Sequence, residues 1–304
     1  MEKKNQIITI VGPKGGVGKT TISANLSIAL SKLGKTVIAV DLDLGASNLH
    51  TLFGLKTSKF TLDDFILGKI KSLSDIIENS NIKGLGIICG GDVPGIANLH
   101  YNRKVKLMQH LSKLEYDFVL LDLSAGVSFN VVDFMIIASE GILITTPEVP
   151  SLLNAYSFIK TFIFRRLGIY FTKSKQDKIL ELLEMAKDFT SNPHLNTMNG
   201  ILEQVKVINP DSVNAINRIL AAFKPIIVIN RVRSDDDLKV GEVLKNLMNQ
   251  YLNIKTSVIL SVHEDNSVSL AIAKLKPVIL EYPLSIFSKD INKIALNLSL
   301  LEPI

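Results

Sequence analysis

The residues with the clearest chemistry form a glycine-rich stretch near the start of the chain, Gly12-Pro-Lys-Gly-Gly-Val-Gly-Lys-Thr-Thr21. It falls between an apolar run over 6–11 and a helical pattern from Thr20 to Leu33. Glycines in such a loop let successive backbone N–H groups point at phosphate oxygens, and the start of the following helix adds partial positive charge. Lys19 would then reach the β- and γ-phosphates of a nucleotide, and the hydroxyl of Thr20 would bind Mg²⁺.

Two residues distinguish this loop from the common phosphate-binding pattern. The pattern G-x-x-x-x-G-K-[ST] has glycine where this chain has Pro13, and the chain carries an early lysine, Lys14. K-G-G-x-G-K-[ST] is the deviant Walker A form, and through it the chain resembles the MinD/ParA family of dimerising ATPases, which includes the flagellar-number regulators FlhG and FleN. The resemblance implies that Lys14 crosses a nucleotide-sandwich dimer to the phosphates bound by the other subunit. It also implies a set of nucleotide-binding residues in the loop: Lys14, Gly15, Gly16, Val17, Gly18, Lys19, Thr20 and Thr21.

A magnesium–nucleotide site also needs carboxylates at strand ends. Two stretches supply them, Val40-Asp-Leu-Asp-Leu-Gly-Ala-Ser-Asn48 and Val119-Leu-Leu-Asp-Leu-Ser-Ala-Gly126, and both resemble the switch regions of the family. The resemblance implies that Asp41 supports the metal shell, that Asp43 orients or polarises the attacking water, and that Asp122 holds Mg²⁺ through water. Gly126 would sense the γ-phosphate. On these assignments the catalytic residues are Lys14, Lys19 and Asp43, and the metal site comprises Thr20, Asp41 and Asp122.

Short apolar runs rich in β-branched residues recur along the chain and alternate with helical or mixed segments. We expect strands near 6–11, 36–41, 85–89, 117–122, 141–146, 225–230 and 257–262. Near-continuous apolar runs such as Phe118-Val-Leu-Leu121 indicate a sheet that is covered on both faces. The pattern predicts an α/β fold, a doubly wound and mostly parallel sheet of about seven or eight strands, as in P-loop NTPases.

The stretch 165–222 breaks this alternation, because it contains helical patterns and no clear strand. We expect a helical insertion there, within a single domain that spans 1–304. The family resemblance covers about 1–160 and 224–300 and leaves the insertion out. After the sixth expected strand it places Asn230 and Arg231 at the position that contacts adenine.

Charge and cysteine content exclude some classes of protein. The 304 residues carry a net charge of +5, which is too small to identify a nucleic-acid binder. Residues 160–178 hold six basic side chains against one acidic side chain, so 158–178 is a candidate contact with a membrane surface or DNA. A helix packed on the core with a solvated basic rim explains the same pattern. The chain has a single cysteine, Cys89, so it cannot form an intrachain disulfide. A single cysteine also argues against membership among the relatives that bind an iron–sulfur cluster through paired cysteines.

These features predict an ATPase that uses ATP and Mg²⁺, with slow, partner-stimulated hydrolysis. We expect it to close a homodimer on ATP and to engage an unidentified protein partner, as a switch in the positioning of flagellar, polar or related machinery. The first apolar run is too short for a signal peptide, and we expect a cytoplasmic protein, peripheral to the membrane or polar. Two alternatives remain: a ParA-type partition ATPase that binds DNA non-specifically, and a metabolic P-loop enzyme that phosphorylates or amidates a small substrate.

Overall fold

The structure is a computed structural model that describes residues 5–44, 47–55, 58–93, 99–138, 140–188, 190–255 and 258–300. Its strands are β1 (Gln6–Gly12), β2 (Val37–Leu42), β3 (Ile77–Asn79), β4 (Leu85–Ile88), β5 (Phe118–Ala125), β6 (Glu140–Thr145), β7 (Ile226–Val232) and β8 (Val258–His263). Its α-helices are α1 (Lys19–Lys32), α2 (Leu62–Ile66), α3 (Tyr101–Leu111), α4 (Phe129–Ala138), α5 (Val149–Lys173), α6 (Asp177–Met185), α7 (Met198–Ile208), α8 (Pro210–Ala222), α9 (Asp235–Leu252), α10 (Asn266–Ala273), α11 (Val278–Glu281) and α12 (Ile286–Ser299). Short 3-10 helices are η1 (Leu49–Phe53), η2 (Leu73–Ile76) and η3 (Pro193–Leu195).

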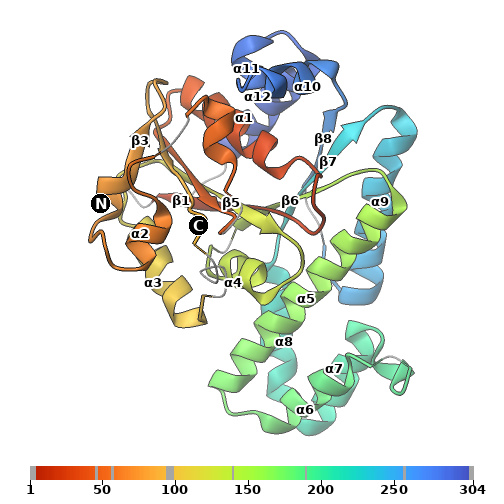
Figure 1. Ribbon diagram of the computed structural model, residues 1–304. Coiled ribbons are helices and arrows are strands. Elements are labelled where there is room, and N and C mark those ends of the chain that lie inside the picture. Colours follow the sequence, from red (N-terminus) through yellow and green to blue (C-terminus); the bar gives the residue numbers. More distant parts are fainter. Residues whose placement is uncertain are drawn as a thin grey trace.

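One eight-stranded sheet forms the centre of the molecule, in the order β3-β4-β2-β5-β1-β6-β7-β8. Only the pairing of β3 with β4 is antiparallel among the ladders of the described residues. Helices α1, α10, α11 and α12 cover one face, and α3, α4, α5 and α9 lie on the other (Figure 1). The expected doubly wound, mostly parallel α/β sheet is therefore confirmed.

The burial pattern of the strands explains why two layers of helices form. Along β5, Val119 and Leu121 pack into the core on the α4 and α5 face, whereas Phe118 and Leu120 pack into the core beside α1. Successive side chains of a strand point to opposite faces, so a continuous apolar run needs cover on both sides. Seven of the strands lie near their expected positions. The three-residue β3 was not predicted, because so short an edge strand leaves almost no periodicity in the sequence.

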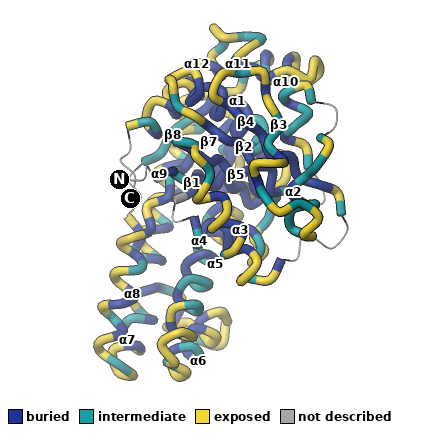
Figure 2. The backbone as a smooth tube through the Cα atoms, turned by 90° about the vertical axis from the view of Figure 1, so that its left-hand side faces the viewer, coloured by how far each residue is buried: buried dark blue, intermediate teal, exposed yellow. Residues whose placement is uncertain are grey.

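Helices α5 to α8 project from the sheet as an elongated arm (Figures 1 and 2). Helix α5 is 25 residues long, and the expected start of the insertion at 165 falls in its middle. The buried side chains of α5 include Phe158, Phe162 and Phe171, and the Phe162 ring stacks on that of Phe223 with centroids 4.2 Å apart. Much of the aromatic content of 158–178 therefore forms the core of the arm rather than an outer surface.

A buried ionic cluster joins three helices at the base of this arm. The Nζ atom of Lys104 on α3 donates to Asp133 Oδ2 at 2.9 Å and to the Phe129 carbonyl at 3.3 Å. The Nε atom of Arg165 on α5 donates to Asp133 Oδ1 at 2.8 Å. The side chains of Lys104 and Asp133 are each only 2% exposed. Because both cations share one carboxylate of α4, the cluster fixes α3, α4 and α5 relative to one another.

Replacing Asp133 tests this cluster. We expect Asp133→Ala to lower the free energy of unfolding by about 3–5 kcal/mol, because it leaves the ammonium of Lys104 buried without a counter-ion. Urea unfolding followed by circular dichroism measures the change. The double variant Lys104→Met/Asp133→Leu should recover most of the loss, and Glu242→Ala, which breaks an exposed pair with Lys245, should cost less than about 1 kcal/mol. An effect of Asp133→Ala as small as that of Glu242→Ala would contradict the assignment.

Candidate functional site: a phosphate loop and its carboxylates

The loop between β1 and α1 presents an uncapped helix end. Gly18 is the N-cap of α1 with φ 97°, in the left-handed region, and no side chain caps the helix. The first turn of α1 contains no acidic residue. Free backbone N–H groups and the helix dipole together favour an anion at this position. Gly16 also has a positive φ, 77°, so both glycines adopt conformations that other residues reach only at a cost.

The end of β7 braces the loop from a distant part of the sequence. Asn230 Nδ2 donates to the Val17 carbonyl at 2.7 Å, and Arg231 Nη2 donates to the Gly16 carbonyl at 2.8 Å. Arg231 has φ 63° and sits where the register of β7 against β8 shifts, between Asn230 and Val232. This irregularity of the β-bulge type turns Arg231 toward the loop. The adenine contact expected of Asn230 and Arg231 stays a prediction, and their support of the loop was not foreseen.

The carboxylates and the loop lysine gather at the carboxyl ends of adjacent strands. Asp41 on β2 and Asp122 on β5 are register partners. Ser23 Oγ on α1 donates to Asp122 Oδ1 at 2.9 Å, and the Thr20 side chain also bonds to Asp122. Lys19, only 7% exposed, interacts electrostatically with both Asp122 and Asp43. The structure thus brings Lys19, Thr20, Asp41, Asp43 and Asp122 together, as the sequence predicted.

Burial shifts the proton affinities of these groups. Burial, followed by the charge of Asp41, raises the pKa of Asp122 to about 7. Burial and the charge of Asp41 also raise the pKa of Asp43, against the opposing effect of Lys19. Burial lowers the pKa of Lys19, while Asp122 and Asp43 act to raise it. A strongly cationic ligand would stabilise the ionised carboxylates, and a phosphate would stabilise the ammonium.

Asp41 lies next to Asp122, and its carboxylate also accepts hydrogen bonds from the turn that follows β2. Its Oδ2 atom accepts hydrogen bonds from Ser47 Oγ at 2.6 Å and from the backbone N–H groups of Asn48 and Leu49, each at 2.9 Å. Its Oδ1 atom accepts from the N–H of Asp43 at 3.0 Å. Asp41 therefore organises the turn that carries Asp43. Gly45 and Ala46 of the same stretch lie outside the described residues.

Gly126 links the second switch-like stretch to the phosphate loop. Its N–H donates to the Gly12 carbonyl at 3.4 Å, and its φ of 114° requires glycine. The register of β1 against β5 shifts just before this point, between Ile10 and Gly12. The expected γ-phosphate sensor therefore lies directly beside the start of the phosphate loop.

The residues present fit a magnesium–nucleotide pair. The oxygens of Thr20 and Asp122 lie together, which suits a hard cation that prefers oxygen ligands and keeps several waters. Among the described residues no group of three or more histidine, cysteine, aspartate or glutamate side chains could hold a metal by itself. Magnesium that is bound mainly through water and phosphate needs no such group.

Sequence reasoning missed two supporting residues of the site. Ser23 holds Asp122, and Ser47 holds Asp41. Ser23 lies four residues after Lys19 on the same helix, which places it one turn further along the face that meets β5. Ser47 gave no comparable signal, because its contact depends on how the turn after β2 folds. Lys14, in contrast, is exposed on the loop surface, where it could reach a second molecule.

Glycine substitutions test the loop geometry. We expect Gly18→Ala to lower the free energy of unfolding by about 1–3 kcal/mol, because a left-handed backbone is strained for alanine. Its Cβ would also lie 2.4 Å from Asn230 Nδ2. Gly15→Ala is the matched control, since no atom lies within 4 Å of its added Cβ and its φ is not in that region. Urea unfolding without nucleotide measures both; equal stability of the two variants would refute the geometry.

The raised pKa of Asp122 predicts a pH-dependent stability. The folded carboxyl binds its proton more tightly than the unfolded one, whose pKa is 3.8, so stability from this group falls as pH rises from about 4 to about 7. In EDTA at pH 8, we expect Asp122→Asn to be more stable than the parent by at least about 1 kcal/mol, the value of one pKa unit.

Thermal unfolding from pH 5 to 8 measures this difference. The difference in stability between Asp122→Asn and the parent should become smaller at low pH. The exposed control Glu203→Gln should have the same stability as the parent at every pH. A parent protein whose stability rose across this range while that of Asp122→Asn did not would contradict the prediction.

Comparisons with known proteins agree with this geometry. Residues 8–278 match the model of the CobQ/CobB/MinD/ParA nucleotide binding domain. A putative septum site-determining protein MinD of Oltmannsiellopsis viridis is 30% identical over 202 residues, which is 66% of this chain and 63% of that protein. The antiactivator FleN of Pseudomonas aeruginosa is 35% identical over 161 residues, 51% of this chain and 55% of that protein. The chain thus spans less than two thirds of the length of these two relatives.

The solved structure of MinD from Pyrococcus horikoshii, complexed with Mg-ADP, has the same fold. Its TM-score is 0.66 at 23% identity, with 97% of this chain and 96% of that chain covered. The matched residues 8–278 include the phosphate loop, all three aspartates and the bracing residues of β7. The chain therefore belongs to the CobQ/CobB/MinD/ParA family of nucleotide-binding domains.

Proposed function

We propose that this protein is an ATPase of the MinD/ParA type that acts as an ATP-dependent dimerisation switch in spatial positioning. The contrast between its two loop lysines carries the proposal. Lys19 is buried beside Asp43 and Asp122, whereas Lys14, five residues earlier, is exposed. A buried lysine serves phosphates within its own subunit, and an exposed one at this spacing can serve those of a second subunit.

The residues of the site divide the chemistry among them. ATP with Mg²⁺ supplies the phosphoryl group and its counter-charge when bound. The backbone of the loop from Gly15 to Thr21 would hold the phosphates, and Lys19 would neutralise charge on the transferred group. Asp43, whose pKa is raised by burial, would orient and polarise water. Thr20 and Asp122 would position the metal.

Hydrolysis in this proposal is slow and is stimulated by a partner. Asp43 lies on a turn whose backbone and Ser47 side chain are bonded to the oxygens of Asp41, so its position depends on how that turn is ordered. Closure of the homodimer would order the turn and bring in the second Lys14. Hydrolysis would then release the dimer from an unidentified protein partner.

The positioning role rests on the relatives rather than on the site. The MinD and FleN matches favour septum, flagellar or polar machinery, and a solved neighbour from Aquifex aeolicus is a MinC:MinD cell division protein complex. DNA partition is not favoured, since Arg165 of the basic stretch is already bonded to the buried carboxylate of Asp133. Among the described residues, no helix is long and apolar enough to cross a bilayer. We propose a cytoplasmic location, peripheral to the membrane or polar, and a single domain with 165–222 as its insertion.

Light scattering after size-exclusion chromatography tests the switch. We expect Asp43→Ala to be a dimer with ATP and Mg²⁺ and a monomer with ADP, because hydrolysis no longer resets the closed state. Adding Lys14→Ala to Asp43→Ala should abolish the dimer while ATP still binds. Lys19→Ala should lose ATP binding by at least about tenfold, the equivalent of 1.4 kcal/mol.

The controls separate binding from dimerisation. Titration with a fluorescent ATP analogue reports binding in each variant, and light scattering reports mass. An unchanged mass of Asp43→Ala in ATP and ADP would refute the switch, and ATP binding by Lys19→Ala at the parent affinity would refute the site.

A further inference from the structure

Arg231 combines a left-handed backbone with a place inside a β-strand. Its φ is 63°, and it lies within β7, which continues to Val232. In the described part of the chain, the other residues besides glycine with a positive φ are Asn81, Lys175, Asn253 and Leu275. Each of these lies in a bend or turn or directly after a helix, where left-handed residues are common. The conformation of Arg231 therefore needs another explanation.

This conformation costs free energy. A left-handed backbone is strained for a residue with a Cβ atom, and such strain persists only where the surroundings enforce it. The ladder between β7 and β8 shifts register between Asn230 and Val232, so the strand bulges at Arg231. Glycine would adopt the same backbone without strain. An arginine at this position indicates that its side chain has a task.

The side chain of Arg231 contacts the phosphate loop. Its Nη2 atom donates to the Gly16 carbonyl at 2.8 Å. The neighbouring Asn230, which is only 6% exposed, donates from Nδ2 to the Val17 carbonyl at 2.7 Å. Two consecutive side chains of β7 thus hold two consecutive carbonyls of the loop.

These two bonds set the direction of N–H groups in the loop. The described residues contain no cis peptide bond, and in a planar trans peptide unit the carbonyl and the following N–H point in opposite directions. The Gly16 carbonyl shares its unit with the N–H of Val17, and the Val17 carbonyl shares its unit with the N–H of Gly18. Both N–H groups therefore point away from the side chains of β7. Neither donates to a backbone carbonyl among the described residues, so both can donate to a phosphate.

Arg231 lies on the carbonyl side of the loop, opposite the side on which these N–H groups would meet a phosphate. Its charge acts on two carboxylates, Glu148 and Glu264, and Glu264 is itself bonded to Arg233. The guanidinium is thus engaged by a loop carbonyl and by nearby negative charge. Its contribution to the site is to hold the loop rather than to offer a free cation to the ligand.

We propose that Arg231 is a positioning residue of the nucleotide site, which keeps the N–H groups of the loop turned toward the phosphates. The strained backbone of β7 is needed because it brings the side chain to the loop. This inference rests on the nucleotide site of the proposed function. It assigns to Arg231 an effect on the affinity for phosphate groups, with or without an attached base. A contact with adenine would change only the affinity for ligands that carry the base.

Inorganic pyrophosphate, which has no base, separates these two roles. Isothermal titration calorimetry measures the binding of pyrophosphate and of ADP, each with Mg²⁺, to the full chain. We expect Arg231→Gly to weaken both ligands by a similar factor, at least about tenfold, the range of one hydrogen bond from a charged donor. Without ligand, Arg231→Gly should melt at least about 2 °C above Arg231→Ala, because both lack the bond and only glycine relaxes the backbone.

Lys175→Gly is the matched control. Lys175 also has a left-handed backbone, with φ 54°, and it lies between α5 and α6 on the projecting arm (Figure 1). Its replacement by glycine should relax the backbone in the same way and leave the affinity for both ligands at the parent value.

Four results would overturn the proposal. These are parent affinity of Arg231→Gly for both ligands, a loss of affinity for ADP alone, equal melting temperatures of Arg231→Gly and Arg231→Ala, and a parent that binds ADP but not pyrophosphate. The last result counts because a loop that is already held in place needs no base to bind phosphates. A parent that binds neither ligand would instead refute the proposed function itself.

Discussion

The buried carboxylate of Asp122 is the feature on which the site depends. It lies at the carboxyl end of a central strand, next to Asp41 in register, and accepts hydrogen bonds from Ser23 and Thr20 of α1. Two carboxylates side by side repel each other, and burial adds a further cost of ionisation. The nearby Lys19 offsets only part of this cost, as the raised pKa of Asp122 indicates. Such a site gains stability from a divalent cation.

Contacts from distant segments give the phosphate loop its shape. Asn230 and Arg231 hold two loop carbonyls from the end of β7, and Gly126 donates to the carbonyl of Gly12 from the end of β5. Both β-strands carry a register shift close to these contacts. Irregular ladders at strand ends redirect backbone and side chains without loss of the sheet. The loop is therefore held by its neighbours before any ligand neutralises the helix end.

Helix α4 connects the arm to the nucleotide site. Helix α4 begins at Phe129, shortly after Gly126, and its Asp133 binds Lys104 of α3 and Arg165 of α5. A buried carboxylate shared by two cations resists rearrangement, because separating either pair leaves a charge without a partner. The base of the arm is thus fixed to the helix that follows the Asp122 strand.

The sequence by itself determined the sheet and the chemistry of the loop. Continuous apolar runs predicted strands covered on both faces, and the spacing of Gly18, Lys19 and Thr20 between a strand and a helix predicted a phosphate loop at the right place. The aspartates at the ends of β2 and β5 could be predicted to meet, because parallel strands place their carboxyl ends at one edge. These features depend on residues that are close together in the sequence, so periodicity and spacing are enough to predict them.

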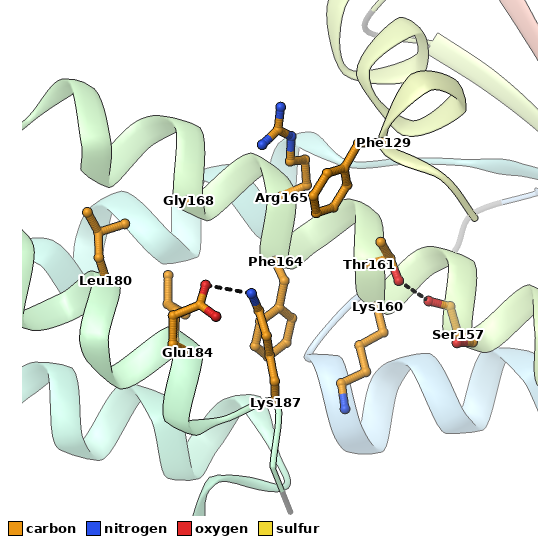
Figure 3. A pocket seen from close by; sticks show the side chains of 11 residues that line it. Phe129, Ser157, Lys160, Thr161, Phe164, Arg165, Gly168, Leu180, Glu184 and Lys187 are labelled. Atoms are coloured by element: carbon orange, nitrogen blue, oxygen red, sulfur yellow. Dashed lines mark hydrogen bonds and ion pairs between the residues drawn. The ribbon is translucent and has the colours of Figure 1, made fainter. Parts of the chain in front are cut away.

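Only the tertiary structure decided which groups support that chemistry. The bond from Asn230 to Val17 joins residues more than two hundred positions apart, and the left-handed bulge at Arg231 has no glycine to mark it. From the sequence, the basic residues near 165 fitted either a contact surface or the solvated rim of a core-packed helix. The fold places Arg165 against the buried Asp133 and beside a cavity of the arm (Figure 3). Burial and partners of a charged side chain depend on which helices pack together, and this packing leaves no local periodicity in the chain.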